Sequence, residues 1–204
     1  MIRAREFGGF HLGPTGFLIV ANILMFIVTV IRPELVKPEL VMSARDGLEV
    51  RSTLALVPGT FMERPWTLLT SMFVHASVWH IFANMFSLYF FGRLVHRLIG
   101  EGKFLIIYFL GGLLGGVFYV LMASSYSYAV GASGAVFAVA GVLTVLRPKL
   151  AVFIIPIPVP IPLWVAVIGG FLLLSLLSLW YGIAWQAHLG GLVFGLMIAY
   201  IFLR

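Results

Sequence analysis

Four polar side chains in this chain have the types and the spacing that serine nucleophilic catalysis requires. Ser133 lies where an apolar segment begins, and His188 lies near the start of the last apolar segment. An imidazole within hydrogen-bond reach turns a serine hydroxyl into a nucleophile by taking its proton. His80 and Asn84 are four residues apart, so a helix would place them on one face, where both could donate hydrogen bonds to an oxyanion. These residues suggest a hydrolase with a Ser–His dyad.

The glycines on both sides of Ser133 suit an oxyanion site. Gly131 and Gly134 let the backbone turn sharply and let a substrate carbonyl approach. The first amides of a helix that begins here have no partner within the helix, and its positive end favours negative charge. A Gly–Ser cluster is also a common helix-packing surface in membranes, so the motif by itself leaves both interpretations open.

A stripe of small residues indicates how His188 could approach Ser133. Gly191 and Gly195 share one helix face with Ala187 at four-residue spacing, which favours close packing against another helix. The segment that begins at Ser133 offers small residues in return, namely Gly134, Ala138 and Gly141. A membrane histidine is also often a helix–helix hydrogen-bonding group, so the Ser–His contact is a hypothesis at this point.

Two further residues are candidates for supporting roles. His75 lies at the expected entrance of the helix that carries His80, where it could orient the loop or lie at the interface without a catalytic part. Phe137 follows Ser133 by one turn and could hold the imidazole of His188 by packing, since the expected spans contain no acidic third member. The same lack of carboxylates argues against a metal site built from His75, His80 and His188, and we expect no metal and no cofactor.

The composition places these segments in a membrane. Hydrophobic residues make up 62% of the 204 residues and charged residues only 10%, whereas soluble domains carry about 25% charged residues. Apolar runs in lipid must be helical, because their backbone groups need partners within the same segment. We therefore predict a single all-α integral membrane domain over residues 1–204, a bundle of six transmembrane helices with an outer loop at 32–74. The helices are expected at 14–31, 75–92, 104–123, 131–146, 163–178 and 183–203.

The distribution of charges predicts how these helices are oriented, because Lys and Arg stay on the cytoplasmic side of short loops. One set of connections holds eight basic and two acidic residues: Arg3, Arg5, Arg93, Arg97, Lys103, Arg147, Lys149 and Arg204 with Glu6 and Glu101. The other set balances five basic and five acidic residues: Arg32, Lys37, Arg45, Arg51 and Arg64 with Glu34, Glu39, Asp46, Glu49 and Glu63. We therefore expect both termini in the cytoplasm and an even number of spans in the cell membrane.

This topology also predicts that the candidate residues share one depth. The second, fourth and sixth helices would all run from outside to inside, and His80, Ser133 and His188 lie within about the first six residues of theirs. The site would thus open to the outside. The net charge of +6 does not indicate a nucleic-acid partner, because the basic residues are scattered among apolar segments and form no patch.

Taken together, these residues resemble the rhomboid family of intramembrane serine proteases, in its minimal six-helix form, over residues 17–204. The resemblance rests on three motifs in family order: His75-x4-His80-x3-Asn84, Gly131-x-Ser133-Gly134 and Ala187-His188-x2-Gly191-x3-Gly195. It implies Ser133 as nucleophile, His188 as general base, and the Ser133 amide as an oxyanion donor together with the side chains of His80 and Asn84. It also implies substrates that are single-span membrane proteins in the lipid bilayer, cleaved near its outer face.

Two positions depart from the family pattern. The family often has Tyr at the position of Phe137. Its first outer loop commonly carries a Trp–Arg pair, whereas here Trp66 is followed by Thr67 and Arg64 lies on the other side of Pro65.

Two other classes of function remain as alternatives. A transporter or channel is favoured by two glycine pairs in the third helix, at 111–112 and 115–116, but the chain lacks the membrane charges and repeat symmetry of coupled transport. A catalytically inactive membrane protein that binds other membrane proteins is the second alternative. It is less favoured, because every dyad and oxyanion position is filled.

Overall fold

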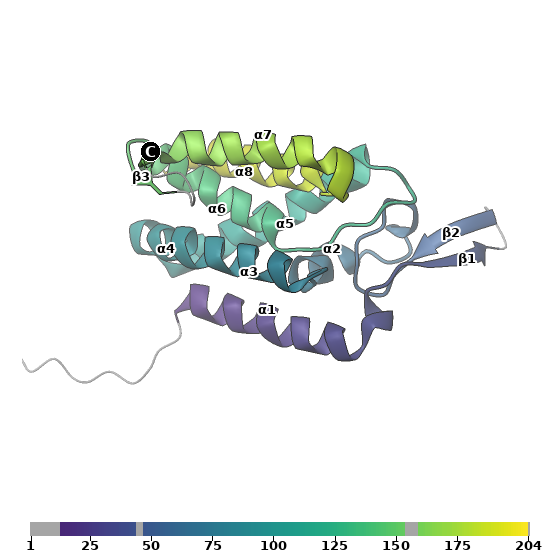
Figure 1. The fold of residues 1–204 in the computed structure, drawn as a ribbon. Helices are drawn as coiled ribbons and strands as arrows, with labels where there is room; N and C mark the ends of the chain where they lie inside the picture. Colours follow the sequence, from purple (N-terminus) through teal and green to yellow (C-terminus); the bar gives the residue numbers. More distant parts are fainter. Residues whose placement is uncertain (1–12, 44–46, 154–158, 204) are drawn as a thin grey trace, which may run out of the picture.

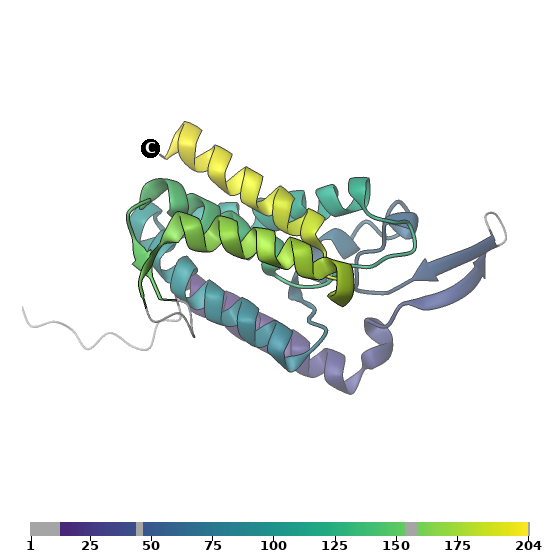
Figure 2. The same cartoon turned by 45° about the horizontal axis from the view of Figure 1, so that its top comes forward.

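The computed structural model describes residues 13–43, 47–153 and 159–203, and shows a helical bundle with a β-hairpin at one end (Figure 1). Four of its helices are long and apolar enough to cross a membrane: α1 (Pro14–Ile31), α5 (Glu101–Met122), α7 (Leu163–Tyr181) and α8 (Trp185–Phe202). In the second view α7 lies in front, with α8 beside it (Figure 2). The predicted class, an all-α membrane bundle, is confirmed, whereas the count of six spans stays a prediction.

The second helix is continuous through three segments, α3 (Val78–Ser87), the π-helical turn η4 (Leu88–Gly92) and α4 (Arg93–Ile99). The expected bounds of 75–92 were wrong at both ends. The helix begins at Val78, because the hydroxyl oxygen of Ser77 accepts a hydrogen bond from the His80 amide and caps the first turn. It continues through Arg93 and Arg97, whose long side chains can reach the membrane surface, and ends where Gly100 takes a φ of 86°.

The other helix ends shift by smaller amounts, each for a local reason. The third helix begins at 101 rather than 104 and ends at 122, since Glu101 in the first turn suits the positive helix end. The fifth continues to 181 rather than 178 and stops at the left-handed Gly182. The sixth spans 185–202 rather than 183–203, because a tight turn joins the Trp185 amide to the Ile183 carbonyl.

Helix α6 (Ser133–Leu146) is short and central. Its 14 residues rise only about 21 Å, less than the roughly 30 Å of a bilayer core, and it is buried over most of its length. It was expected to begin at 131, but Gly131 has a φ of 120°, which is not helical, so the first helical residue is Ser133. The candidate nucleophile is therefore the first residue of the most enclosed helix.

The expected outer loop at 32–74 contains regular structure that the sequence analysis missed. Strand β1 (Glu39–Ser43) pairs antiparallel with β2 (Gly47–Arg51), and the hairpin projects from one end of the bundle in Figures 1 and 2. The short helical turn η1 (Pro33–Leu35) precedes the hairpin, and the short helical segments η2 (Pro58–Thr60), α2 (Thr67–Thr70) and η3 (Ser71–Phe73) follow it. At the opposite end, β3 (Ala151–Val152) pairs with β4 (Ile161–Pro162).

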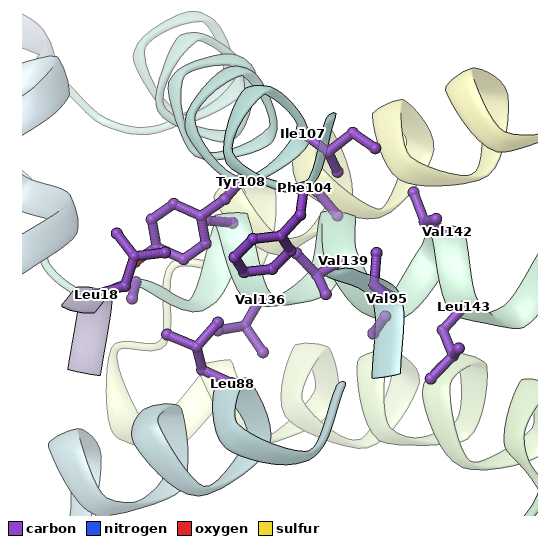
Figure 3. Packing of buried hydrophobic residues seen from close by; sticks show 14 of the residues in the cluster. Leu18, Leu88, Val95, Phe104, Ile107, Tyr108, Val136, Val139, Val142 and Leu143 are labelled. Atoms are coloured by element: carbon purple, nitrogen blue, oxygen red, sulfur yellow. The ribbon is translucent and has the colours of Figure 1, made fainter. Parts of the chain in front are cut away.

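The apolar core lies between α1, the α3–α4 helix, α5 and α6. Its largest fully buried side chains include Leu18, Leu88, Val95, Phe104, Tyr108, Val139, Val142 and Leu143, of which Figure 3 shows the packing. Buried core side chains in a bundle hold their helices in a fixed register, because protein interiors are packed like crystals. The helix that begins at Ser133 is thus held by contacts along its whole length.

The two charge sets of the sequence analysis lie at opposite ends of the bundle. The described residues of the basic set lie on α4, at the start of α5 and in the connection beside β3, at the end that carries the C-terminus (Figure 1). The balanced set surrounds the hairpin at the other end. Arg3, Arg5, Glu6, Arg45, Asp46 and Arg204 lie outside the described residues. The assignment of these ends to the inside and outside of a cell stays a prediction.

Candidate active site

Ser133 and His188 lie within hydrogen-bond reach of each other. The Ser133 Oγ atom is 2.8 Å from the His188 Nε2 atom, a distance at which the hydroxyl donates to an unprotonated ring nitrogen. His188 lies in the first turn of α8 and only 5% of its surface is exposed. Its Nδ1 atom is buried and has no hydrogen-bond partner in the part of the chain that the structure describes. The pair is therefore a dyad by geometry, without a carboxylate to orient the imidazole.

The Phe137 ring packs against the His188 ring, where it can fix the orientation of the imidazole. Its centroid is 4.8 Å from that of the His188 ring, and the two planes are tilted by 30°. Phe137 lies one turn after Ser133 on α6, so the helix that carries the hydroxyl also carries this ring. Packing against an aromatic face restricts the rotation of the imidazole.

Glycines allow α6 and α8 to approach closely enough for this contact. A Cβ atom added at Gly191 would overlap the carbonyl group of Gly134, and one added at Gly195 would overlap that of Ala138. The small-residue stripe on the sixth helix thus packs directly on the backbone of the fourth, as small residues do between membrane helices. Gly134 has no side chain and Ala138 has only a methyl group, which permits this approach.

Helix α5 supports both dyad helices through residues that the sequence analysis had not assigned to the site. A Cβ atom at Gly115 would lie 2.6 Å from the Ala187 carbonyl oxygen and 3.5 Å from the Gly134 Cα atom. Gly111, one turn earlier, packs on the side chain of Ala138, since an added Cβ atom would overlap the Ala138 Cβ atom. These glycines belong to the two pairs that had favoured a transporter, and their four-residue spacing was the available signal of this packing.

His80 lies beside the turn that precedes Ser133. A Cβ atom at Gly131 would lie 2.7 Å from the Nε2 and Cε1 atoms of the His80 ring, so the missing side chain leaves the ring its place. The His80 Nδ1 atom accepts a hydrogen bond from the Ala76 amide at 3.3 Å. A neutral imidazole that accepts at Nδ1 carries its proton on Nε2, which therefore donates. The His80 ring thus presents a donor on the side of the candidate nucleophile.

His75 and Asn84 contact the site less directly. The His75 Nε2 atom accepts a long hydrogen bond of 3.5 Å from the Ala132 amide, and its ring lies edge-on to that of His80, with centroids 5.1 Å apart. Asn84 is buried and donates one amide hydrogen to the His80 carbonyl at 2.9 Å, which leaves its second hydrogen for another acceptor. His75 therefore contacts the loop before Ser133, whereas Asn84 bonds within its own helix.

A small cavity lies against Ser133. Its volume is about 20 Å³, enough for one water molecule, and it is lined by residues from several elements, among them Ser71, Gly116, Gly131, Ser133 and Ala187. The Gly131 amide donates to the Ser71 carbonyl at 2.8 Å, which fixes the wall of this cavity next to the nucleophile. Within the described ranges, no group of three or more His, Asp or Glu side chains could hold a metal ion.

A comparison with family models places the chain among known proteins. The model of the Rhomboid domain matches residues 62–204, more than half of the chain and all of the candidate site. This chain belongs to the rhomboid family. The membership confirms the resemblance inferred from the sequence, and it identifies the protein as a multi-pass membrane protein.

Individual relatives include proteins named as proteases and one named as inactive. The rhomboid protease GluP of Bacillus subtilis is 38% identical over 78 residues, which cover 38% of this chain and 15% of GluP. The rhomboid protease GlpG of Salmonella newport is 29% identical over 142 residues, covering 67% of this chain and 48% of GlpG. The inactive RHOMBOID-like protein 8 of Arabidopsis thaliana is 39% identical over 56 residues, 28% of this chain and 16% of that protein. This rhomboid spans less than half the length of each of them.

The structure also shows what replaces the usual Trp–Arg pair in the loop that follows α1 in this rhomboid. The Trp66 Nε1 atom donates to the Thr53 carbonyl at 3.0 Å, and the Arg64 Nη1 atom donates to the Ser52 carbonyl at 3.1 Å. The two side chains therefore hold neighbouring backbone groups despite the intervening proline. Arg64 thus fixes the same loop segment as Trp66, although it does not follow the tryptophan directly.

Proposed function

We propose that this rhomboid is an intramembrane serine endopeptidase that cleaves membrane-anchored proteins near the outer membrane face. The observation that carries the proposal is the distance of 2.8 Å between Ser133 Oγ and His188 Nε2. A buried, oriented base at this distance is what activation of a serine hydroxyl needs. The membership of the chain in a family that includes named proteases supports the same reaction.

The reaction begins when the Ser133 Oγ atom attacks the carbonyl carbon of the scissile peptide bond and its proton passes to His188 Nε2. The tetrahedral intermediate collapses as the protonated His188 gives that proton to the leaving amine, which leaves an acyl-enzyme on Ser133. Water then attacks the ester, with His188 as general base, and the hydroxyl of Ser133 is restored. The cavity beside Ser133 has room for such a water molecule.

The oxyanion of the intermediate would be stabilised by three kinds of donor. The first amides of α6, starting with that of Ser133, point out of the helix without a partner inside it. The His80 Nε2 hydrogen lies beside Gly131, and Asn84 retains one free amide hydrogen. Removing one such donor in other enzymes costs about 10²–10³-fold in rate. The positively polarised end of α6 adds to the same effect.

The remaining candidate residues would act by positioning. Phe137 stacks on His188, while Gly191 and Gly195 bring α8 onto α6. Gly131 and Gly134 leave room around the nucleophile, and His75 contacts the amide that precedes it. No metal or cofactor takes part in this mechanism.

The substrates would be single-span membrane proteins that enter the site from the bilayer. The proposed orientation has six spans, with the α3–α4 helix and the short α6 as the second and fourth, both termini in the cytoplasm of a cell, and the site open to the outside. It is supported by the excess of basic residues at one end of the bundle.

The two alternative functions differ in what supports them. The glycine pairs of α5, which had favoured a transporter, pack against Ala138, Met72, Ala187 and Leu68, and this packing gives them a structural role. The alternative of an inactive binding protein is supported by one relative that is named as inactive. The proposal and this alternative differ only in turnover, so turnover must be measured.

The test is cleavage of a membrane-tethered reporter by the purified protein in liposomes. We expect cleavage by the parent and none by Ser133→Ala or His188→Ala, with thermal stability changed by no more than about 1 kcal/mol in Ser133→Ala, which loses a single hydroxyl. Equal turnover by the parent and Ser133→Ala would reject the proposal. No cleavage by the parent of any such reporter would favour the inactive binding protein.

A further inference from the structure

The β1–β2 hairpin stands out from the rest of this rhomboid, because it leaves the bundle at the end where the loop into Ser133 lies (Figures 1 and 2). We propose that the open edge of β1 binds the outer segment of the substrate as a third, extended strand. This inference rests on the proposed function, since it assigns a second contact to the same membrane-anchored substrates.

One face of the hairpin is apolar and faces solvent. The register pairs Leu40 with Val50, and Met42 lies two residues further on the same face. Leu40 and Met42 are 67% and 75% exposed. Neighbouring apolar side chains at alternating positions are what an extended peptide contacts when it joins a sheet. A two-stranded hairpin is at best marginally stable alone, so a third strand would also stabilise it.

The backbone of β1 is open at the residues that carry these side chains. The Thr60 hydroxyl donates to the Val50 carbonyl at 3.5 Å, so this carbonyl points away from β1. In an antiparallel ladder, such a residue and its partner form a non-hydrogen-bonded pair. The amide and carbonyl groups of Leu40 therefore point to the free side of β1, and those of Met42 do so by the same alternation. Unpaired groups of this kind are a template for strand addition.

The root of the hairpin is fixed to the bundle. The Ser52 hydroxyl donates to the Val36 carbonyl at 2.9 Å and accepts from the Ala55 amide at 3.1 Å. Arg64 and Trp66 hold the carbonyl groups of residues 52 and 53, as described above. A strand that is rigid at its root binds a peptide with a smaller loss of conformational freedom than a mobile loop would.

The same segment runs directly to the candidate active site. Leu56 and Ala129 form an antiparallel bridge with hydrogen bonds of 3.0 and 2.8 Å, and Ala129 precedes Ser133 by four residues. Leu56 follows Arg51, the last residue of β2, by five residues, which span roughly 17 Å when extended. A substrate cleaved at Ser133 would therefore reach the hairpin with a short stretch of its outer segment.

The surroundings favour a peptide over a lipid surface. The hairpin projects away from the helices, so its exposed face lies beyond the end of the bundle (Figures 1 and 2). Its charges balance locally, since Arg51 lies 2.8 Å from Glu49 and 3.8 Å from Glu63. The described residues of the hairpin thus offer no excess of basic charge for anionic headgroups. Backbone pairing and apolar contact remain as the means of recognition.

The test compares two single-span reporters with the same membrane helix. One carries about 20 outer residues rich in Val and Thr, and the other carries about five. The measured quantity is the ratio of kcat/KM for the long reporter to that for the short one. Met42→Pro removes the edge amide without removing a ladder hydrogen bond, and should lower this ratio about three- to tenfold, as expected for one or two lost backbone hydrogen bonds. Met42→Val keeps the amide and should retain the ratio.

A second measurement distinguishes loss of the edge amide from a distortion of the hairpin by proline. A photo-crosslinking residue in place of Met42, in the Ser133→Ala background, should capture the outer segment of the long reporter. Capture of a second copy of this chain or of lipid would overturn the proposal, as would equal ratios for the parent and Met42→Pro. If the parent cleaves neither reporter, the proposed protease function is rejected. The proposal that the hairpin binds a substrate is then rejected with it.

Discussion

The carbonyl oxygen of Ala187 packs on Gly115, so the residue before His188 lies against helix α5. A Cβ atom at Gly115 would lie 2.6 Å from this oxygen, well inside van der Waals contact, and 3.5 Å from the Gly134 Cα atom. The nucleophile and the base of the proposed mechanism thus lie on two helices that meet a third at one glycine. Their separation depends on backbone contacts rather than on polar side chains.

Gly115→Ala should therefore lower activity although it removes no polar group. The new methyl group would push α8 or α6 outward by a fraction of an ångström, and misplacement by about 1 Å can cost on the order of 10²-fold when geometry controls the reaction. We expect a fall of about tenfold or more in kcat, with a smaller change in KM. The measurement is steady-state kinetics with a reporter in liposomes.

The matched control is Gly169→Ala on α7, where an added Cβ atom would meet no atom within 4 Å. This variant should keep the activity of the parent. Both variants gain the same methyl group, so equal kinetics for the two would show that the contact between Gly115 and Ala187 does not position the dyad.

His80→Ala and Asn84→Ala should lower kcat by different factors. The His80 ring lies at the turn before Ser133, whereas the Asn84 side-chain amide already donates one hydrogen bond to the His80 carbonyl. We expect kcat to fall by about 10²–10³-fold in His80→Ala and by less in Asn84→Ala. An effect limited to KM in both variants would assign these residues to substrate binding instead of oxyanion stabilisation.

The orientation of the bundle can be tested with single cysteines, because the chain has none of its own. Lys37→Cys lies on the exposed connection before β1, and Lys149→Cys lies in the exposed connection before β3. In intact cells an impermeant maleimide should label the first and not the second. The reverse pattern would place the candidate site on the cytoplasmic face.

The helices and the relation between Ser133 and His188 could be predicted from the sequence because their signals are local. Long apolar runs must be helical in lipid, and the glycines around Ser133 and after His188 mark the close approach of two helices. The end of the second helix could not be predicted in this way. Arg93 and Arg97 ended the apolar run, yet the helix continues to Ile99 because long basic side chains can reach the membrane surface.

The hairpin and the role of α5 depend on contacts between distant residues. In the hairpin, Leu40 and Met42 alternate with residues whose pairing depends on a second strand, and the alternation of one short segment does not identify that strand. The glycines of α5 had an evident spacing, but the partner at Ala187 is 72 positions away from Gly115 and belongs to another helix. Spacing indicates that a helix packs closely without identifying its partner.

The most direct test of the account is covalent labelling of the purified protein with a fluorophosphonate, followed by mass spectrometry of the modified peptide. An activated serine reacts with such a probe, whereas an ordinary serine hydroxyl does not, because the reaction needs a base that takes the hydroxyl proton. We predict modification at Ser133, at a rate that falls strongly in His188→Ala. No labelling of Ser133, or equal labelling with and without His188, would contradict the proposed dyad.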